Sequence, residues 1–101
     1  MIADTTFDNL YGMIKRGDLL GVRAWLVQGG DPNLLNRFGW TPLMAASMLG
    51  RTDIVELLLA SGADPRLQNQ FGDTATSLAA LKGFHSTKDI LEKAVAEDSR
   101  P

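Results

Sequence analysis

Side chains that could catalyse a reaction or bind a metal are scarce in this sequence. It contains one histidine, His85, and no cysteine. A thiolate nucleophile, a disulfide and a cysteine-ligated metal are therefore excluded, and one histidine cannot build a histidine-rich metal site. Ser86 follows His85 directly, but no acid is placed to orient the imidazole ring for catalysis. We therefore expect no enzyme, no metal and no cofactor, with His85 in a loop and Ser86 capping a helix.

The glycines recur at a fixed interval, which indicates an internal repeat. Gly17, Gly50 and Gly83 are spaced by 33 residues. The same offset relates Gly29 to Gly62, Asp31-Pro32 to Asp64-Pro65, Asn36 to Asn69, Phe38 to Phe71 and Thr41 to Thr74. Glycines that end helices explain this pattern, so we expect no phosphate-binding loop.

Local rules predict two short helices in each repeat. Thr41 can cap a helix whose first residue is Pro42, because proline suits the first helical position. Gly50 ends that helix, since glycine enters the left-handed conformation without a Cβ penalty. Thr52 or Asp53 is then expected to cap a second helix with a broad apolar stripe.

The segment between two helix pairs predicts a projecting turn. Asn36 and Gly39 are typical of the first and last positions of a type I turn, and residues 69–72 repeat it. Because such short helices are unstable alone, the pairs must stack to bury their apolar stripes. We expect an all-α solenoid of about three repeats, 4–35, 36–68 and 69–97, with a short polar tail at 98–101. Trp25, at the position of Leu58, is expected in the core.

The composition limits the number of domains and the kinds of partner. The 101 residues suit a single domain, 1–101, and 12 acidic against 10 basic residues give a net charge of −2. Nucleic-acid binders usually need an excess of cations, so we expect no nucleic-acid partner. No apolar stretch approaches the length needed to cross a bilayer, and residues 1–8 do not resemble a secretory signal. We expect a cytoplasmic protein without membrane association.

The middle repeat closely resembles the ankyrin repeat. The resemblance lies in residues 39–46, in Gly50 and in residues 54–64, and weaker copies precede and follow. Met44 departs from the family, which usually has a histidine there. Lys88 and Glu92 replace apolar residues of the middle copy, which suits a terminal repeat whose outer face meets water.

The resemblance implies a protein-binding surface made of turn tips and first helices, without chemistry of its own. The positions it identifies are Arg37, Phe38, Trp40, Met48, Leu49, Gln70, Phe71, Asp73, Leu81 and Lys82. In the first copy, Tyr11, Lys15 and Arg16 extend the same surface.

Several of these residues also have a structural interpretation. Trp40 can offer a rigid contact at a turn tip, or fold back across the neighbouring turn. Phe38 and Phe71 recur at one repeat position, which favours packing between adjacent turns. Met48 and Leu49 either line the groove or are covered by the first repeat.

We therefore expect a protein-interaction module that regulates or tethers a partner protein. The alternative is a self-associating repeat unit, in which an end face containing Phe7, Leu10 and Ile14 pairs two chains. The expected state is a monomer or a weak homodimer. Neither the partner nor the effect of binding on it is encoded in recognisable residues.

Overall fold

The computed structural model describes residues 6–98, and this part of the chain contains six helices and no strand. The helices are α1 (Thr6–Arg16), α2 (Leu19–Val27), α3 (Pro42–Met48), α4 (Thr52–Ala60), α5 (Ala75–Leu81) and α6 (His85–Asp98). The predicted all-α architecture is confirmed. The predicted start of the first repeat at residue 4 and residues 99–101 of the predicted tail lie outside the described residues, while Asp98 belongs to α6.

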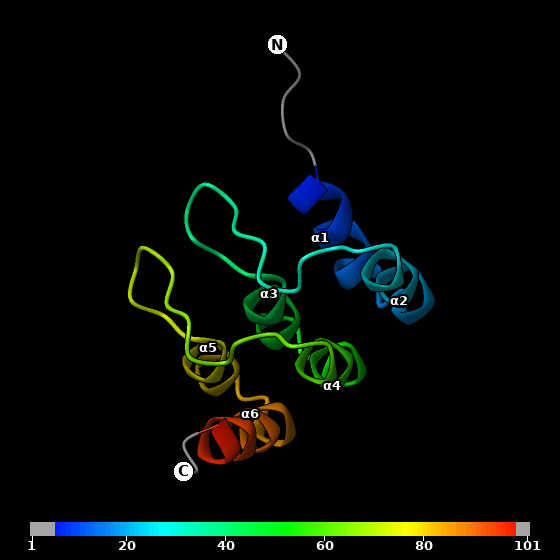
Figure 1. Cartoon of the computed structure of the whole chain (residues 1–101). Helices are drawn as coiled ribbons and strands as arrows, with labels where there is room; N and C mark the ends of the chain where they lie inside the picture. The colour runs from blue at the N-terminus through cyan, green and yellow to red at the C-terminus, as the bar shows by residue number, and fades with distance from the viewer. Residues whose placement is uncertain (1–5, 99–101) are drawn as a thin grey trace.

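The helices form two rows (Figure 1). α1, α3 and α5 pack side by side in the first row, and α2, α4 and α6 form the second row beside it, on the side away from the long turns. The segments between α2 and α3 and between α4 and α5 extend as long turns beyond the first row. Each helical hairpin therefore packs against the next, and the turns lie together on one side of the stack.

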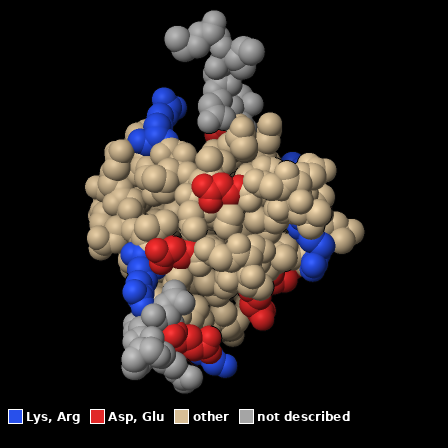
Figure 2. Space-filling model, in the orientation of Figure 1, with Lys and Arg blue, Asp and Glu red and all other residues tan. Residues whose placement is uncertain are grey.

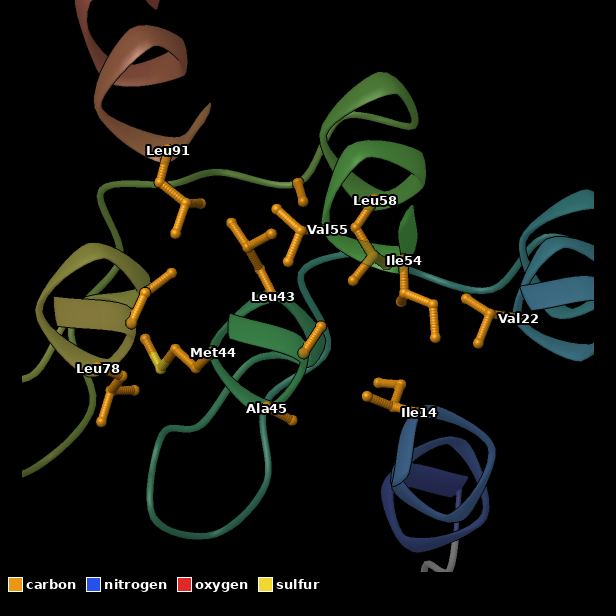
Figure 3. Close-up of a cluster of buried hydrophobic side chains, with 14 of the residues drawn as sticks. Ile14, Val22, Leu43, Met44, Ala45, Ile54, Val55, Leu58, Leu78 and Leu91 are labelled. Atoms are coloured by element: carbon orange, nitrogen blue, oxygen red, sulfur yellow. The ribbon is translucent and has the colours of Figure 1, made fainter. Parts of the chain in front are cut away.

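Apolar side chains from all three hairpins meet between successive hairpins and between the two rows. In Figure 3, Met44 of α3 points toward Leu78 of α5, and Ile54 of α4 points toward Val22 of α2. All four of these side chains are buried. The methionine that departs from the family pattern thus fills the interface between two repeats. Because each hairpin supplies one wall of the core, stacking rather than helix propensity stabilises the short helices.

The two shorter first-row helices begin as the sequence predicts. The Met44 backbone N–H donates to Thr41 Oγ1 at 3.1 Å, and Pro42 is the first residue of α3. At α5, the Ser77 N–H donates to Thr74 Oγ1 at 3.1 Å, and the Thr74 N–H donates to Ser77 Oγ at 2.9 Å. This reciprocal pair is a capping box, which satisfies two backbone donors that have no partner inside the helix.

The predicted cap of α4 is wrong. The cap position is Arg51, whose side chain makes no capping hydrogen bond, and both predicted caps lie within α4. The Thr52 hydroxyl instead forms a 2.9 Å hydrogen bond with the hydroxyl of Thr87 on α6. Asp53 accepts a hydrogen bond from the Ile54 N–H through Oδ1. The Thr52 side chain therefore bonds to a residue of the next repeat and does not cap the helix.

The start of α6 also differs from the prediction. His85 is its first residue and Ser86 its second, so the histidine is not in a loop and the serine does not cap the helix. The preceding turn is short because the Phe84 N–H donates to the Ala79 carbonyl, which ends α5 tightly. The Lys88 N–H then donates to the Phe84 carbonyl at 2.9 Å, which starts α6 at once.

The first hairpin is less completely covered than the middle one. Trp25 packs against the core but remains half-buried, whereas its equivalent Leu58 is buried. The prediction that Trp25 is a core residue is thus only partly right, because within the described residues no helix covers the outer side of α2. Leu10 and Ile14 are, by contrast, fully buried against the stack. They are not available for the end-face contact that the self-association hypothesis assigned to them.

Candidate functional site

Two asparagines shape the projecting turns. Asn36 Oδ1 accepts hydrogen bonds from the N–H groups of Phe38 and Trp40, each at 2.9 Å. The turn closes where the Gly39 N–H donates to the Asn36 carbonyl and the Asn36 N–H donates to the Trp40 carbonyl, both at 3.0 Å. Asn69 makes the matching side-chain bonds in the second turn. The repeated asparagine therefore gives both turns one backbone shape.

The two turns are also bonded to each other. The Gln70 backbone N–H donates to the Phe38 carbonyl at 3.0 Å, and its side-chain Nε2 donates to the Arg37 carbonyl at 2.9 Å. The Phe38 and Phe71 rings pack with their centroids 6.4 Å apart. The Arg37 guanidinium lies over the Phe38 ring, 5.3 Å from its centroid. Phe38 and Phe71 thus have the inter-turn packing role, while Phe71 keeps 69% of its surface exposed.

Trp40 lies at the base of the first turn and not at its tip. Its carbonyl pairs with the Asn36 N–H across the base, and Thr41, the cap of α3, follows it. The side chain is half-buried and packs against the core. The sequence-based placement at a turn tip is therefore wrong, because Arg37 and Phe38 occupy the tip. The indole instead borders the junction between the turn and α3.

A hollow of about 310 Å³ opens at this junction. Three of the residues predicted for binding line it: Phe38, Trp40 and Met48. Tyr11, expected to extend the groove, lines it too. The remaining lining residues are Phe7, Asp8, Asn36 and Ala45. The hollow therefore joins α1, the first turn and α3, which are contributed by two repeats.

Sequence reasoning had not placed Phe7, Asp8, Asn36 or Ala45 in a binding site. A signal for one of them was present, because Phe7 precedes Trp40 by 33 residues and so has the same position in its repeat. Phe7 was assigned instead to a dimer contact. Asp8 carries no such signal, since its place in the hollow depends on how α1 packs against α3.

The other predicted positions lie outside this hollow. Leu49 is half-buried against the core at the end of α3. Leu81 and Lys82 are exposed at the end of α5, and Asp73 is half-buried at the base of the second turn. Met48 and Leu81 are 33 residues apart and occupy one row on successive first helices. Met48 is half-buried, whereas Leu81 is 76% exposed.

Charged side chains are scattered over the face drawn in Figure 2, which is mostly uncharged. Among the described residues, no group of three or more histidine, cysteine, aspartate or glutamate side chains is arranged to hold a metal ion. No helix in this part of the chain is long and apolar enough to span a membrane.

The comparison with protein families agrees with this geometry. A family model described as ankyrin repeats, in three copies, matches residues 10–98. The chain belongs to the ankyrin-repeat family. The three helical hairpins and their bonded turns are thus three ankyrin repeats, numbered 1 to 3 from the N-terminus. The hollow lies between ankyrin repeats 1 and 2.

Two mouse proteins (Mus musculus) contain similar ankyrin sequences. The 2-5A-dependent ribonuclease is 42% identical over 53 residues, which is 52% of this chain and 7% of the ribonuclease. Cyclin-dependent kinase 4 inhibitor B is 41% identical over 59 residues, which is 58% of this chain and 45% of the inhibitor. The matched regions therefore span less than half of either relative.

Proposed function

We propose that this ankyrin domain is a non-enzymatic module that binds a partner protein through the hollow and the adjoining surface of its first helices. One observation carries the proposal: the hollow combines the side chains of Trp40 and Met48 with residues from a second repeat. Tryptophan gives a large, rigid contact area, and methionine adapts to an apolar partner. Both are half-buried, so each can lose further surface on binding.

The family and one relative support a regulatory role. Ankyrin repeats are protein-interaction modules, and cyclin-dependent kinase 4 inhibitor B is, by its name, an inhibitor of a protein. We infer that this chain regulates or tethers its partner by occupying a surface, because binding alone requires no catalytic group. The ribonuclease activity named for the other relative is not carried over, since the match covers 7% of that protein.

The test compares capture of partners from the native cell by wild-type protein and by single variants. Trp40→Ala and Met48→Ala should each reduce recovery of a specific partner roughly tenfold, the loss typical of a central interface residue. Ile90→Ala is the matched control, because Ile90 is a half-buried apolar side chain on α6 that packs against the core, as Trp40 and Met48 do, but does not line the hollow. Equal recovery with all four proteins would refute the assignment of the site.

A second candidate function, self-association, is favoured by the outer face of α2. Leu20 and Val27 are 76% and 80% exposed, and they lie seven residues, or about two helical turns, apart on the same face. The equivalent residues are Asp53 and Ala60 in repeat 2. In repeat 3 they are Ser86 and Lys93. Repeat 1 alone thus has two large aliphatic side chains there, a pattern typical of a contact surface.

Sedimentation velocity over a range of protein concentrations tests this candidate. The wild-type protein should show a concentration-dependent dimer. A variant carrying Leu20→Ser and Val27→Lys, the residues that repeat 3 has at these positions, should remain monomeric. A wild-type protein that is monomeric at every concentration would eliminate self-association.

A further inference from the structure

The hollow gathers most of the aromatic side chains of the chain. The sequence contains two tryptophans, one tyrosine and four phenylalanines. Four of these seven line the hollow: Phe7, Tyr11, Phe38 and Trp40. Aromatic rings carry partial negative charge on their faces and attract cations, with tryptophan the strongest. The hollow is therefore suited to a cation as well as to an apolar group.

The charge of the lining favours a cation over an apolar group. Asp8 is exposed at the rim, in the first turn of α1, and makes no ion pair within residues 6–98. Among the described residues that line the hollow, none is a lysine or arginine. A positively charged ligand would thus meet one carboxylate and several rings, with the Arg37 guanidinium against the Phe38 ring as a neighbouring cation. A negatively charged ligand would meet repulsion from Asp8.

The size of the hollow fits one side chain. Its volume of about 310 Å³ is at the lower end of the roughly 300–1,000 Å³ range of small-molecule sites. It opens at the surface between the first turn and α1, where a residue of a docked protein can enter. A single long side chain projecting from a partner is therefore the appropriate occupant.

One arginine already packs against a single lining ring, that of Phe38, and the rings left to a ligand are those of Phe7, Tyr11 and Trp40. The Arg37 side chain lies over the Phe38 ring, with its Cζ 5.3 Å from the centroid. A guanidinium is planar and less strongly hydrated than an ammonium group, so it stacks on aromatic rings at lower cost. It also offers parallel N–H donors that match both oxygens of a carboxylate such as Asp8.

We propose that the hollow binds an arginine side chain of the partner protein, whose guanidinium packs against the aromatic lining and donates hydrogen bonds to the Asp8 carboxylate. This inference rests on the proposed function, because it specifies the chemistry of the partner at the same site. It makes arginine, rather than lysine or an apolar residue, the central contact residue of that partner.

The probes are three blocked amino acids: the Nα-acetyl methylamides of arginine, citrulline and lysine. Citrulline has nearly the shape of arginine but is neutral, and lysine is charged without the planar group. Each is titrated into nitrogen-15-labelled protein, with the indole N–H signals followed by NMR. Trp40 lines the hollow and Trp25 lies on α2, so one tryptophan reports binding and the other is an internal control.

The arginine derivative should shift the Trp40 signal saturably and leave Trp25 unchanged. Citrulline and lysine should each bind at least roughly fivefold more weakly, a modest ratio because Asp8 is exposed to solvent. Asp8→Asn should reduce arginine binding to the level of citrulline. Asp53→Asn is the matched control, since Asp53 is in the first turn of α4 and away from the hollow, and it should change nothing.

Four results would overturn the inference: no shift at Trp40, equal binding of citrulline, equal or tighter binding of lysine, or unchanged arginine binding by Asp8→Asn. An unaltered amide spectrum of Asp8→Asn shows that the variant is folded, so its loss of binding has one interpretation. The outcome is separable from the proposed function. If Trp40→Ala and Met48→Ala abolish partner capture while the arginine probe does not bind, the module binds a partner of different chemistry.

Discussion

Replacing Gly50 by alanine should destabilise the domain more than the same change at Gly83. Both glycines follow a first-row helix and have positive φ, 68° and 77°. Alanine in this left-handed conformation costs about 1–2 kcal/mol at either site. The surroundings differ, because a Cβ at Gly50 would lie 2.8 Å from the Phe84 ring, whereas nothing lies within 4 Å at Gly83.

The extra cost at Gly50 is that of overpacking. Overpacking a core typically costs about 1–3 kcal/mol, and the Phe84 ring, which is 37% exposed, has room to shift; the extra cost is therefore about 1 kcal/mol, and Gly50→Ala should lose roughly 2–3 kcal/mol in all. Gly83→Ala should lose only the backbone part, about 1–2 kcal/mol. For a domain of this size, each kcal/mol lowers the melting temperature by about 4–8 °C.

The assay is equilibrium urea denaturation of both variants, followed by circular dichroism. Phe84→Ala in the Gly50→Ala background removes the ring and should recover the overpacking part of the loss, once the effect of Phe84→Ala alone is subtracted. Equal destabilisation by Gly50→Ala and Gly83→Ala would refute the reasoning. It would mean that Phe84 moves aside without cost.

Three further changes test other contacts. Thr87→Val removes the inter-repeat hydroxyl bond to Thr52 and should lower the free energy of unfolding by about 1 kcal/mol, measured by urea denaturation. Valine at both positions should lower it by less than the two single changes added together. Asn69→Ala leaves the two N–H donors of the second turn without their acceptor and should lower the free energy of unfolding by about 1–3 kcal/mol. Amide hydrogen exchange should become faster, at first only in that turn. Glu92→Gln breaks the 3.6 Å ion pair with Lys88 on the surface of α6 and should lower the free energy of unfolding by no more than about 0.5 kcal/mol. A loss above about 1 kcal/mol would contradict this expectation.

The sequence predicted the helix starts and ends that depend on neighbouring residues. Thr41 caps α3 and Gly50 ends it because both features involve residues within one turn of the helix. The prediction for Thr52 failed because its hydroxyl bonds to Thr87, which is 35 residues away. A hydroxyl with two available partners cannot be assigned from its neighbours alone.

The hollow was predicted in part for the same reason. Phe38, Trp40 and Met48 lie in one repeat and were identified together. The wall that completes the site comes from α1, through Phe7 and Asp8, and its position depends on how two repeats pack. Comparing equivalent residues across the 33-residue interval finds Phe7, but the packing itself is needed to place Asp8.

The bonds between the two turns have a consequence for association. Gln70 fastens the second turn to the carbonyls of Arg37 and Phe38, and the two phenylalanine rings pack against each other. A partner that contacts both turns would meet a surface whose shape exists before the encounter. Little conformational entropy is then lost on docking. For the same contact area, these turns therefore bind a partner more tightly than mobile loops of the same composition would.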